Sequence, residues 1–161
     1  KRGFMPEMRQ LPGLLKQERE ALSCSLKILF QVQTDPKIRG STYASTAVER
    51  LMRLCSSVLS NYVAKERMLQ EQSDAQAAEG EKKALVVEIE REVLGLVPIV
   101  SEVVLRGLKD LEQEQFAKYL PGMFPLLAEL VAVNSREVRV VVRDILVEQV
   151  APHFPERPAT T

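Results

Sequence analysis

The sequence contains no tryptophan, and aromatic residues make up only 5% of its 161 residues. Proteins that bind single-stranded nucleic acids usually stack the bases on aromatic side chains, so a binder of this type is not expected. Lysine and arginine together number 22, as do aspartate and glutamate, so the formal net charge is zero. A nucleic-acid binder that relies on bulk positive charge is therefore not expected either.

Histidine and cysteine are also scarce. His153 is the only histidine and lies between two prolines, so neither a Ser–His–Asp triad nor a zinc site with two histidines can be assembled. Cys24 and Cys55 are too few for a disulfide framework or a metal site. Because each falls within a helical apolar pattern, we predict two small buried hydrophobes in a reducing compartment. We predict no catalytic residue, no cofactor and no metal, and we do not expect an enzyme.

Long apolar runs are absent as well. No run reaches the ~18 residues that a membrane-spanning helix needs. The stretch KRGFMPEMRQLPG has basic residues but lacks the apolar segment of a signal peptide. We expect a piece of a longer cytoplasmic protein.

Hydrophobic residues make up 45% of the chain, enough for a core. Apolar residues at helical steps predict a helix from about Leu14 to Gln33, which Asp35-Pro36 ends because the residue before proline disfavours the α region. A second helix is predicted to end near Gln70 and to start at about Thr46 or earlier, since Thr46 and Glu49 have capping-box spacing. Residues 71–83 are small and polar and predict a flexible linker between two helical halves.

The second half continues the helical pattern but is interrupted by prolines. Residues 84–108 are strongly apolar, and Pro98 either kinks one helix or begins a new one; both alternatives remain open. Pro121 and Gly122 are predicted to break the following helix, and another then starts at about Met123. Residues 152–161 are predicted to form a C-terminal tail, so the chain as a whole, residues 1–161, is a single helical domain or solenoid fragment.

The stretch NSREVRVVVRDIL, residues 134–146, is ambiguous. Its valines favour a strand by propensity, whereas Asn134 as an N-cap with Glu137 three residues later predicts a helix. A strand needs a pairing partner, and no other segment resembles one. We therefore predict a helix from about Ser135 to Val150 with its valines buried.

Helices separated by short loops predict an all-α fold. Antiparallel helix pairs with a shared core are typical of a HEAT- or armadillo-like α-solenoid fragment. A compact helical bundle is the alternative, because no strict repeat is visible in the sequence.

Charged side chains offer one candidate interaction surface. Arg139 and Arg143 lie four residues apart on the last predicted helix, with Arg136 nearby, and together they could contact an acidic partner or anionic lipid. They could equally form a solvated face beside Glu137 and Asp144. The alternating Glu88, Glu90 and Glu92 do not share a helix face, so we interpret them as solvated.

Two segments also resemble the C-terminal helical-repeat region of the large brefeldin-A-inhibited guanine-nucleotide exchange factors for Arf GTPases, the BIG class. In the first half of that family's pattern, one helix starts with Leu-Leu-x-Gln-Glu and ends with Leu-x-x-Leu-Phe. The second half has a Pro-Val-Val helix, then a Phe-rich helix, then a Glu-Leu-Arg helix. The chain is similar to this pattern from about Leu11 to Val150. Leu96, Val97 and Leu108 depart from it, because the family usually has Trp and Tyr in these two regions. The matching residues are Leu14, Leu15, Gln17, Glu18, Leu26, Leu29, Phe30, Pro98–Val100, Phe116, Leu120, Phe124, Pro125, Leu126 and Glu137–Arg143.

This resemblance implies a non-catalytic regulatory or scaffolding segment downstream of a separate exchange domain. Its implied role is in vesicle trafficking, through protein contacts, autoinhibition or self-association at Golgi and trans-Golgi membranes. The implied partners are proteins of the Arf GTPase pathway, other domains of the parent chain, a second copy and a peripheral membrane surface, but no nucleic acid. A generic HEAT-like adaptor that binds a peptide or helix of a trafficking partner is the alternative.

Overall fold

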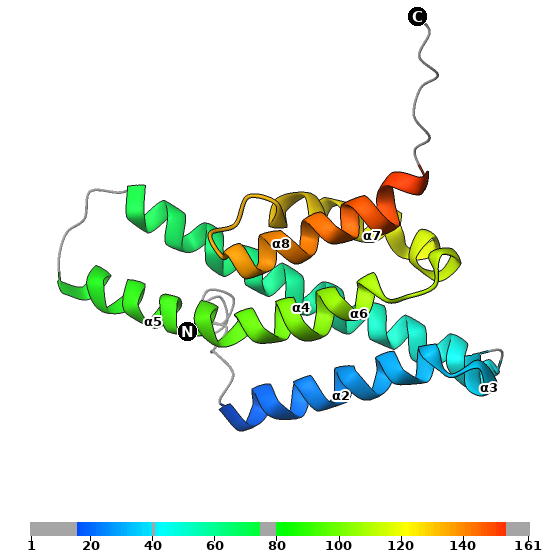
Figure 1. Cartoon of the computed structure of the whole chain (residues 1–161). Coiled ribbons are helices and arrows are strands. Elements are labelled where there is room, and N and C mark those ends of the chain that lie inside the picture. Colours follow the sequence, from blue (N-terminus) through cyan, green and yellow to red (C-terminus); the bar gives the residue numbers. More distant parts are fainter. Residues whose placement is uncertain (1–15, 40, 75–79, 154–161) are drawn as a thin grey trace, which may run out of the picture.

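The computed structural model describes residues 16–39, 41–74 and 80–153, and these are almost entirely helical (Figure 1). Within the described residues there is no strand, so the predicted all-α fold is confirmed, including a helix at the ambiguous NSREVRVVVRDIL stretch. The elements are α2 (Lys16–Thr34), α3 (Pro36–Arg39), α4 (Thr42–Asp74), α5 (Gly80–Pro98), the π-helical segment η1 (Ile99–Leu105), α6 (Arg106–Lys109), α7 (Gln113–Leu130), α8 (Arg136–Ile145), the π-helical segment η2 (Leu146–Val150) and the short η3 (Ala151–His153).

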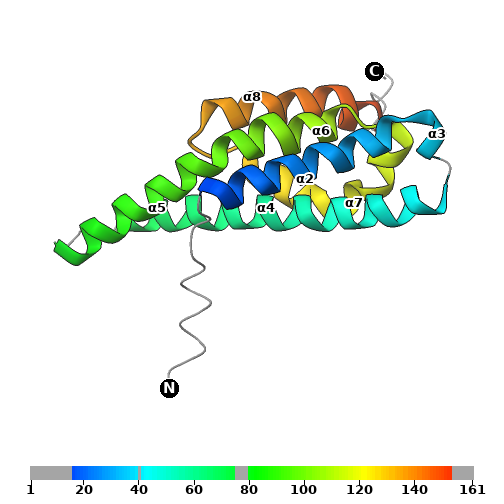
Figure 2. The same cartoon turned by 90° about the horizontal axis from the view of Figure 1, so that it is seen from below.

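The helices alternate between two layers. Segments α5, η1 and α6 form one continuous rod, which lies between α2 and α8 in the first layer, while α4 and α7 form the second (Figures 1 and 2). Helix α2 runs parallel to the rod, because Arg19 lies beside Gly95 and Phe30 beside Gly107. This alternation is compatible with the predicted solenoid fragment and also with a compact bundle.

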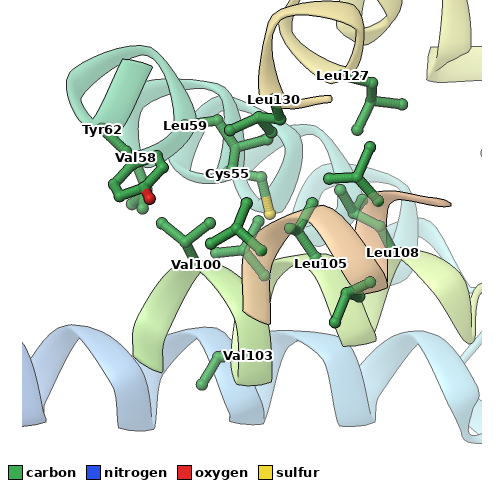
Figure 3. Close-up of a cluster of buried hydrophobic side chains, with 14 of the residues drawn as sticks. Cys55, Val58, Leu59, Tyr62, Val100, Val103, Leu105, Leu108, Leu127 and Leu130 are labelled. Atoms are coloured by element: carbon green, nitrogen blue, oxygen red, sulfur yellow. The ribbon is translucent and has the colours of Figure 1, made fainter. Parts of the chain in front are cut away.

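The η1 segment of the rod is deeply buried. Six of the seven η1 residues are buried, and Glu102 is the exception. The apolar sequence of η1 suits this buried position, because α2 and α8 cover two sides of the rod and α4 packs on a third. Its residues meet α4 and α7 in a shared apolar cluster that includes Leu59, Val100 and Leu127 (Figure 3).

Pro98 does not end the rod. Its backbone is helical, and the chain continues directly into η1. The Ser101 hydroxyl donates a hydrogen bond to the Val97 carbonyl at 2.8 Å, inside the widened turn. A proline has no N–H to donate to the carbonyl four residues earlier. A π-helical turn is one way for a helix to continue past this missing hydrogen bond. The alternative of a new helix starting at Pro98 is therefore excluded.

The predicted break at Pro121 and Gly122 is wrong. Helix α7 runs without interruption from Gln113 to Leu130 and contains both Pro121 and Pro125. These prolines and Gly122 are exposed, so water can bond the carbonyls that the missing N–H groups leave unpaired. The opposite face of α7 holds the helix in the core through Phe116, Met123, Leu127 and Leu130.

Other boundaries also shift from the sequence prediction. Helix α4 begins at Thr42 because the Ser41 hydroxyl accepts a hydrogen bond from the Ala44 amide, as an N-cap does. Residues 71–74 and 80–83 of the predicted 71–83 linker are helical, and residues 75–79 lie outside the described residues. Of the predicted tail, residues 152 and 153 belong to η3 and residues 154–161 lie outside the described residues.

The two cysteines differ in burial. Cys55 is fully buried on α4, as predicted, and desolvation raises the pKa of its thiol to about 12. Cys24 is exposed on α2, so its predicted burial is wrong. The apolar pattern of α2 did not show which flank of the helix would face a neighbour.

Two buried glutamine side chains join elements that are distant in sequence. The Gln33 amide donates to the Ala44 carbonyl at 3.2 Å and accepts from Gln115 at 3.1 Å, which links α2, α4 and α7. The Gln149 amide donates to the Lys109 and Leu111 carbonyls, both at 2.7 Å. Gln149 therefore satisfies carbonyl groups at the C-terminal end of the rod, where no helical N–H follows.

Candidate functional site

The three arginines predicted as an interaction surface all lie on α8. This helix begins one residue later than predicted, because Ser135 rather than Asn134 is the N-cap and its hydroxyl accepts from the Val138 amide at 3.3 Å. Val138, Val141, Val142 and Ile145 are buried and hold α8 against the rod and α7. The side of α8 opposite these residues faces solvent.

Arg139 contacts the protein's own backbone. Its guanidinium Nη1 donates to the carbonyls of Val133 and Asn134, both at 2.7 Å. These carbonyls lie in the loop between α7 and α8, where no helical N–H can satisfy them. Arg139 therefore holds this loop in place, and the structure gives it a role in the fold.

Removing this contact should destabilise the protein. Replacing Arg139 by alanine is expected to lower the free energy of unfolding by about 1–2 kcal/mol, because two charged hydrogen bonds to the loop are lost. The matched change of Arg143 to alanine should stay within about 0.5 kcal/mol, as is usual for exposed sites. Urea unfolding followed by circular dichroism measures both. Equal losses of unfolding free energy in the two variants would contradict a structural role that Arg139 has and Arg143 lacks.

Arg136 and Arg143 remain on the outer surface together with two valines. Val140 is 45% exposed and Val147 is 63% exposed, so the prediction that the valines of this helix are buried is wrong for these two. The four residues follow one another at steps of four, three and four, which places them on one line along α8 and its continuation η2, where Val147 lies. We call Arg136, Val140, Arg143 and Val147 the α8 ridge.

The charges of α8 are segregated around the ridge. Asp144 and Glu148 lie toward the rod, where the Lys109 ammonium is 3.8 Å and 3.6 Å from their carboxylate oxygens. Within the described residues, neither Arg136 nor Arg143 forms an ion pair. The outer line of α8 is thus positively charged and apolar, and its acidic side chains lie on the flank facing the rod.

A groove runs beside the α8 ridge. It encloses about 760 Å³ between η1 and α8 and is lined by Ser101, Glu102, Arg106, Arg136, Glu137, Val140 and Val141. Its charges balance, with two arginines and two glutamates. One wall is the π-helical segment η1, and π-helical turns in proteins occur frequently at functional sites.

The remaining charged residues singled out from the sequence are structural or solvated. Glu88 and Glu90 are exposed, as predicted. Glu92 is not solvated, because it forms an ion pair with Lys65 of α4, with side chains only 18% and 9% exposed. This pair ties α4 to α5.

A second polar contact lies on α4 beside this pair, because Glu66 directly follows Lys65 in the chain. The Tyr62 hydroxyl donates to a Glu66 carboxylate oxygen at 2.8 Å, and both residues are buried. Burial and the neighbouring Glu66 carboxylate raise the pKa of Tyr62 well above its usual range, so the hydroxyl stays protonated and keeps donating.

The described residues show no group of three or more potential metal ligands. None of their helices is long and apolar enough to cross a bilayer. The His153 side chain lies outside the part of the chain whose side chains are described.

Among comparisons with known proteins, a family model described as the BIG2 C-terminal domain matches residues 1–147. No curated protein and no solved structure matches the chain.

The match bears on the exchange-factor family suggested by the sequence motifs. BIG2 is also the name of a group of bacterial immunoglobulin-like surface domains, and in that sense the match contradicts an Arf exchange factor. On that meaning of the name, the exchange-factor assignment is wrong, and the Golgi and trafficking roles that it implied have no support. An immunoglobulin-like domain is a sandwich of about seven strands, whereas the described residues are helical. The helices thus do not support an immunoglobulin-like surface role for this chain either.

Proposed function

The chain belongs to the BIG2 C-terminal domain family, and from this starting point we propose that it is a non-enzymatic protein-interaction module. The α8 ridge is its binding surface, and its ligand is an acidic amphipathic helix of a protein partner. One observation carries the proposal, namely the line in which two exposed valines alternate with two arginines that form no ion pair within the described residues.

The dimensions of the ridge suit a helical ligand. From Arg136 to Val147 it spans eleven residue steps, or about 16 Å along a helix axis. Helices commonly bind through side chains that repeat at steps of three and four. Leucines of such a ligand would cover Val140 and Val147, while its glutamates would pair with Arg136 and Arg143.

A charge-reversal variant tests the ridge. The probe is a fluorescein-labelled helical peptide whose leucines repeat at helical spacing between glutamates, followed by fluorescence anisotropy. Changing Arg136 and Arg143 to glutamate should weaken binding by about tenfold or more, because attraction becomes like-charge repulsion. Changing Val140 and Val147 to serine should weaken binding without altering its dependence on salt, since the charges remain.

The matched control reverses two exposed arginines elsewhere, Arg53 on α4 and Arg91 on α5, with the same change in net charge. An equal loss in this control would show non-specific attraction and contradict the site. Sedimentation of the chain alone shows whether a second copy already occupies the ridge. Binding to phosphatidylserine vesicles without saturable peptide binding would overturn a protein ligand in favour of a membrane surface.

A further inference from the structure

We propose that the pocket between α2, α3 and α4 is a second recognition site, which takes a bulky apolar side chain within an acidic peptide segment. The proposal is independent of the α8 ridge and rests on different residues. We call this cavity the α2–α4 pocket.

The walls of the α2–α4 pocket are mainly apolar. Leu29 and Val32 of α2, Ile38 of α3 and Ala47 of α4 line a space of about 620 Å³. Ligand-binding cavities have similar dimensions, about 300–1,000 Å³, and a similar apolar lining. A phenylalanine or leucine side chain would bury apolar surface there that water otherwise contacts.

Local sequence explains why a hollow forms here. Asp35 caps α3 through a hydrogen bond that its Oδ1 accepts from the Lys37 amide at 2.9 Å, and Pro36 occupies the first helical position. The chain therefore makes a separate short helix between α2 and α4. This turn sets the two long helices apart at their connected ends.

An exposed aromatic residue lies at the pocket. Tyr43 is 83% exposed, more than any other large hydrophobic residue described as exposed. Tyrosine is enriched among the residues that dominate binding energy in protein interfaces, because its ring buries a large area at little entropic cost. Tyr43 is thus placed to cover a ligand that enters the pocket.

The charged residues of the α2–α4 pocket favour an acidic ligand. Lys37 and Arg50 line the pocket, and none of the described residues that line it is acidic. The nearest acidic side chains along the chain point elsewhere, because Asp35 caps α3 and Glu49 lines a different cavity between α4 and α7. An apolar hollow whose described charged residues are both basic favours an apolar side chain flanked by aspartate or glutamate.

The pocket and the ridge lie on opposite sides of the rod. Helix α2 flanks one side of the rod and α8 the other (Figure 2). Two ligands could therefore bind without competing. This arrangement suits a module that bridges two partners.

The test uses the whole chain labelled with ¹⁵N and three short peptides, namely an acidic peptide with a central phenylalanine, the same peptide with alanine in its place, and a basic peptide with the phenylalanine. We expect only the first to cause saturable shifts of the amides around Ile38 and Ala47. Changing Ala47 to phenylalanine fills the pocket and keeps every charge, and it should weaken binding by about tenfold or more.

Charge variants separate the pocket from general attraction. Reversing Lys37 and Arg50 to glutamate should abolish the shifts, whereas reversing Arg53 and Lys118, which line the cavity between α4 and α7, should preserve them. Binding should also survive reversal of Arg136 and Arg143 on the ridge. Failure of all three peptides to bind, equal binding of the alanine peptide, or equal losses in both charge variants would overturn the proposal.

Discussion

Replacing Leu105 by alanine is expected to lower the free energy of unfolding by about 3–4 kcal/mol. Leu105 is fully buried at the end of η1 and belongs to the cluster that joins the rod to α4 and α7 (Figure 3). The variant loses apolar burial and also leaves a cavity, because helices on several sides of the rod cannot all move inward. Small domains have a total stability of about 5–15 kcal/mol, so this one change removes a large share.

Urea unfolding followed by circular dichroism at the helical minimum measures the loss. Val140 to alanine is the matched control, because it also shortens an aliphatic helical residue but at an exposed position. It should change stability by no more than about 0.5 kcal/mol. Should the alanine variant of Leu105 fail to fold, Leu105 to valine gives a smaller change at the same place. A loss below 1 kcal/mol at Leu105 would contradict the position of the rod at the centre of the core.

Alanine at Gly107 is expected to destabilise the protein by about 1–3 kcal/mol, although alanine favours a helix more than glycine does. A Cβ atom at Gly107 would overlap the ring of Phe30, which is itself buried on α2. Relief requires the buried ring to leave its rotamer or α2 to move away from the rod, and either change disturbs the packing between them. The gain in helix propensity, about 1 kcal/mol, only partly offsets this cost.

The control for Gly107 is the same substitution at Gly122, which should have the opposite sign. A Cβ atom at Gly122 meets nothing within 4 Å. Alanine there should stabilise α7 by about 0.5–1 kcal/mol, because it reduces the conformational freedom of the unfolded chain.

A double-mutant cycle identifies the cause at Gly107. Phe30 to leucine should cost less stability in the Gly107-to-alanine background than in the original chain, since the smaller side chain relieves the overlap. Additive effects of the two substitutions would show that the ring is not the obstacle. The same sign at Gly107 and Gly122 would contradict the close approach of α2 to the rod.

The sequence predicted helix positions correctly where local capping and apolar spacing alone decide them. Asp35-Pro36 ended α2 as predicted, and the apolar steps placed α8 even though its valines favour a strand. Local rules failed at Pro121 and Gly122, because packing of the other face of α7 and solvent on the proline side together outweigh the helix-breaking tendency. The general expectation that the valines of this helix are buried was wrong for Val140 and Val147, because they lie off the helical spacing that faces the core.

The candidate site was found only in part. The spacing of the three arginines placed them on one helix, but which of them is held by the protein's own backbone depends on the loop that lies beside them. Arg139 reaches the Val133 and Asn134 carbonyls because the α7–α8 loop folds back over the start of α8. The α2–α4 pocket had no sequence signal, since its walls come from three helices.

The sequence by itself determined that the described part of the chain is helical and which of its residues could face a core. These properties depend on residue type and on spacing over a few residues, where helical geometry is regular. Only the tertiary structure decided that the rod lies between α2 and α8, that Arg139 serves the fold, and that the α8 ridge remains exposed. Those outcomes depend on contacts between residues far apart in the chain, such as Phe30 with Gly107 and Gln149 with Lys109, which no local pattern specifies.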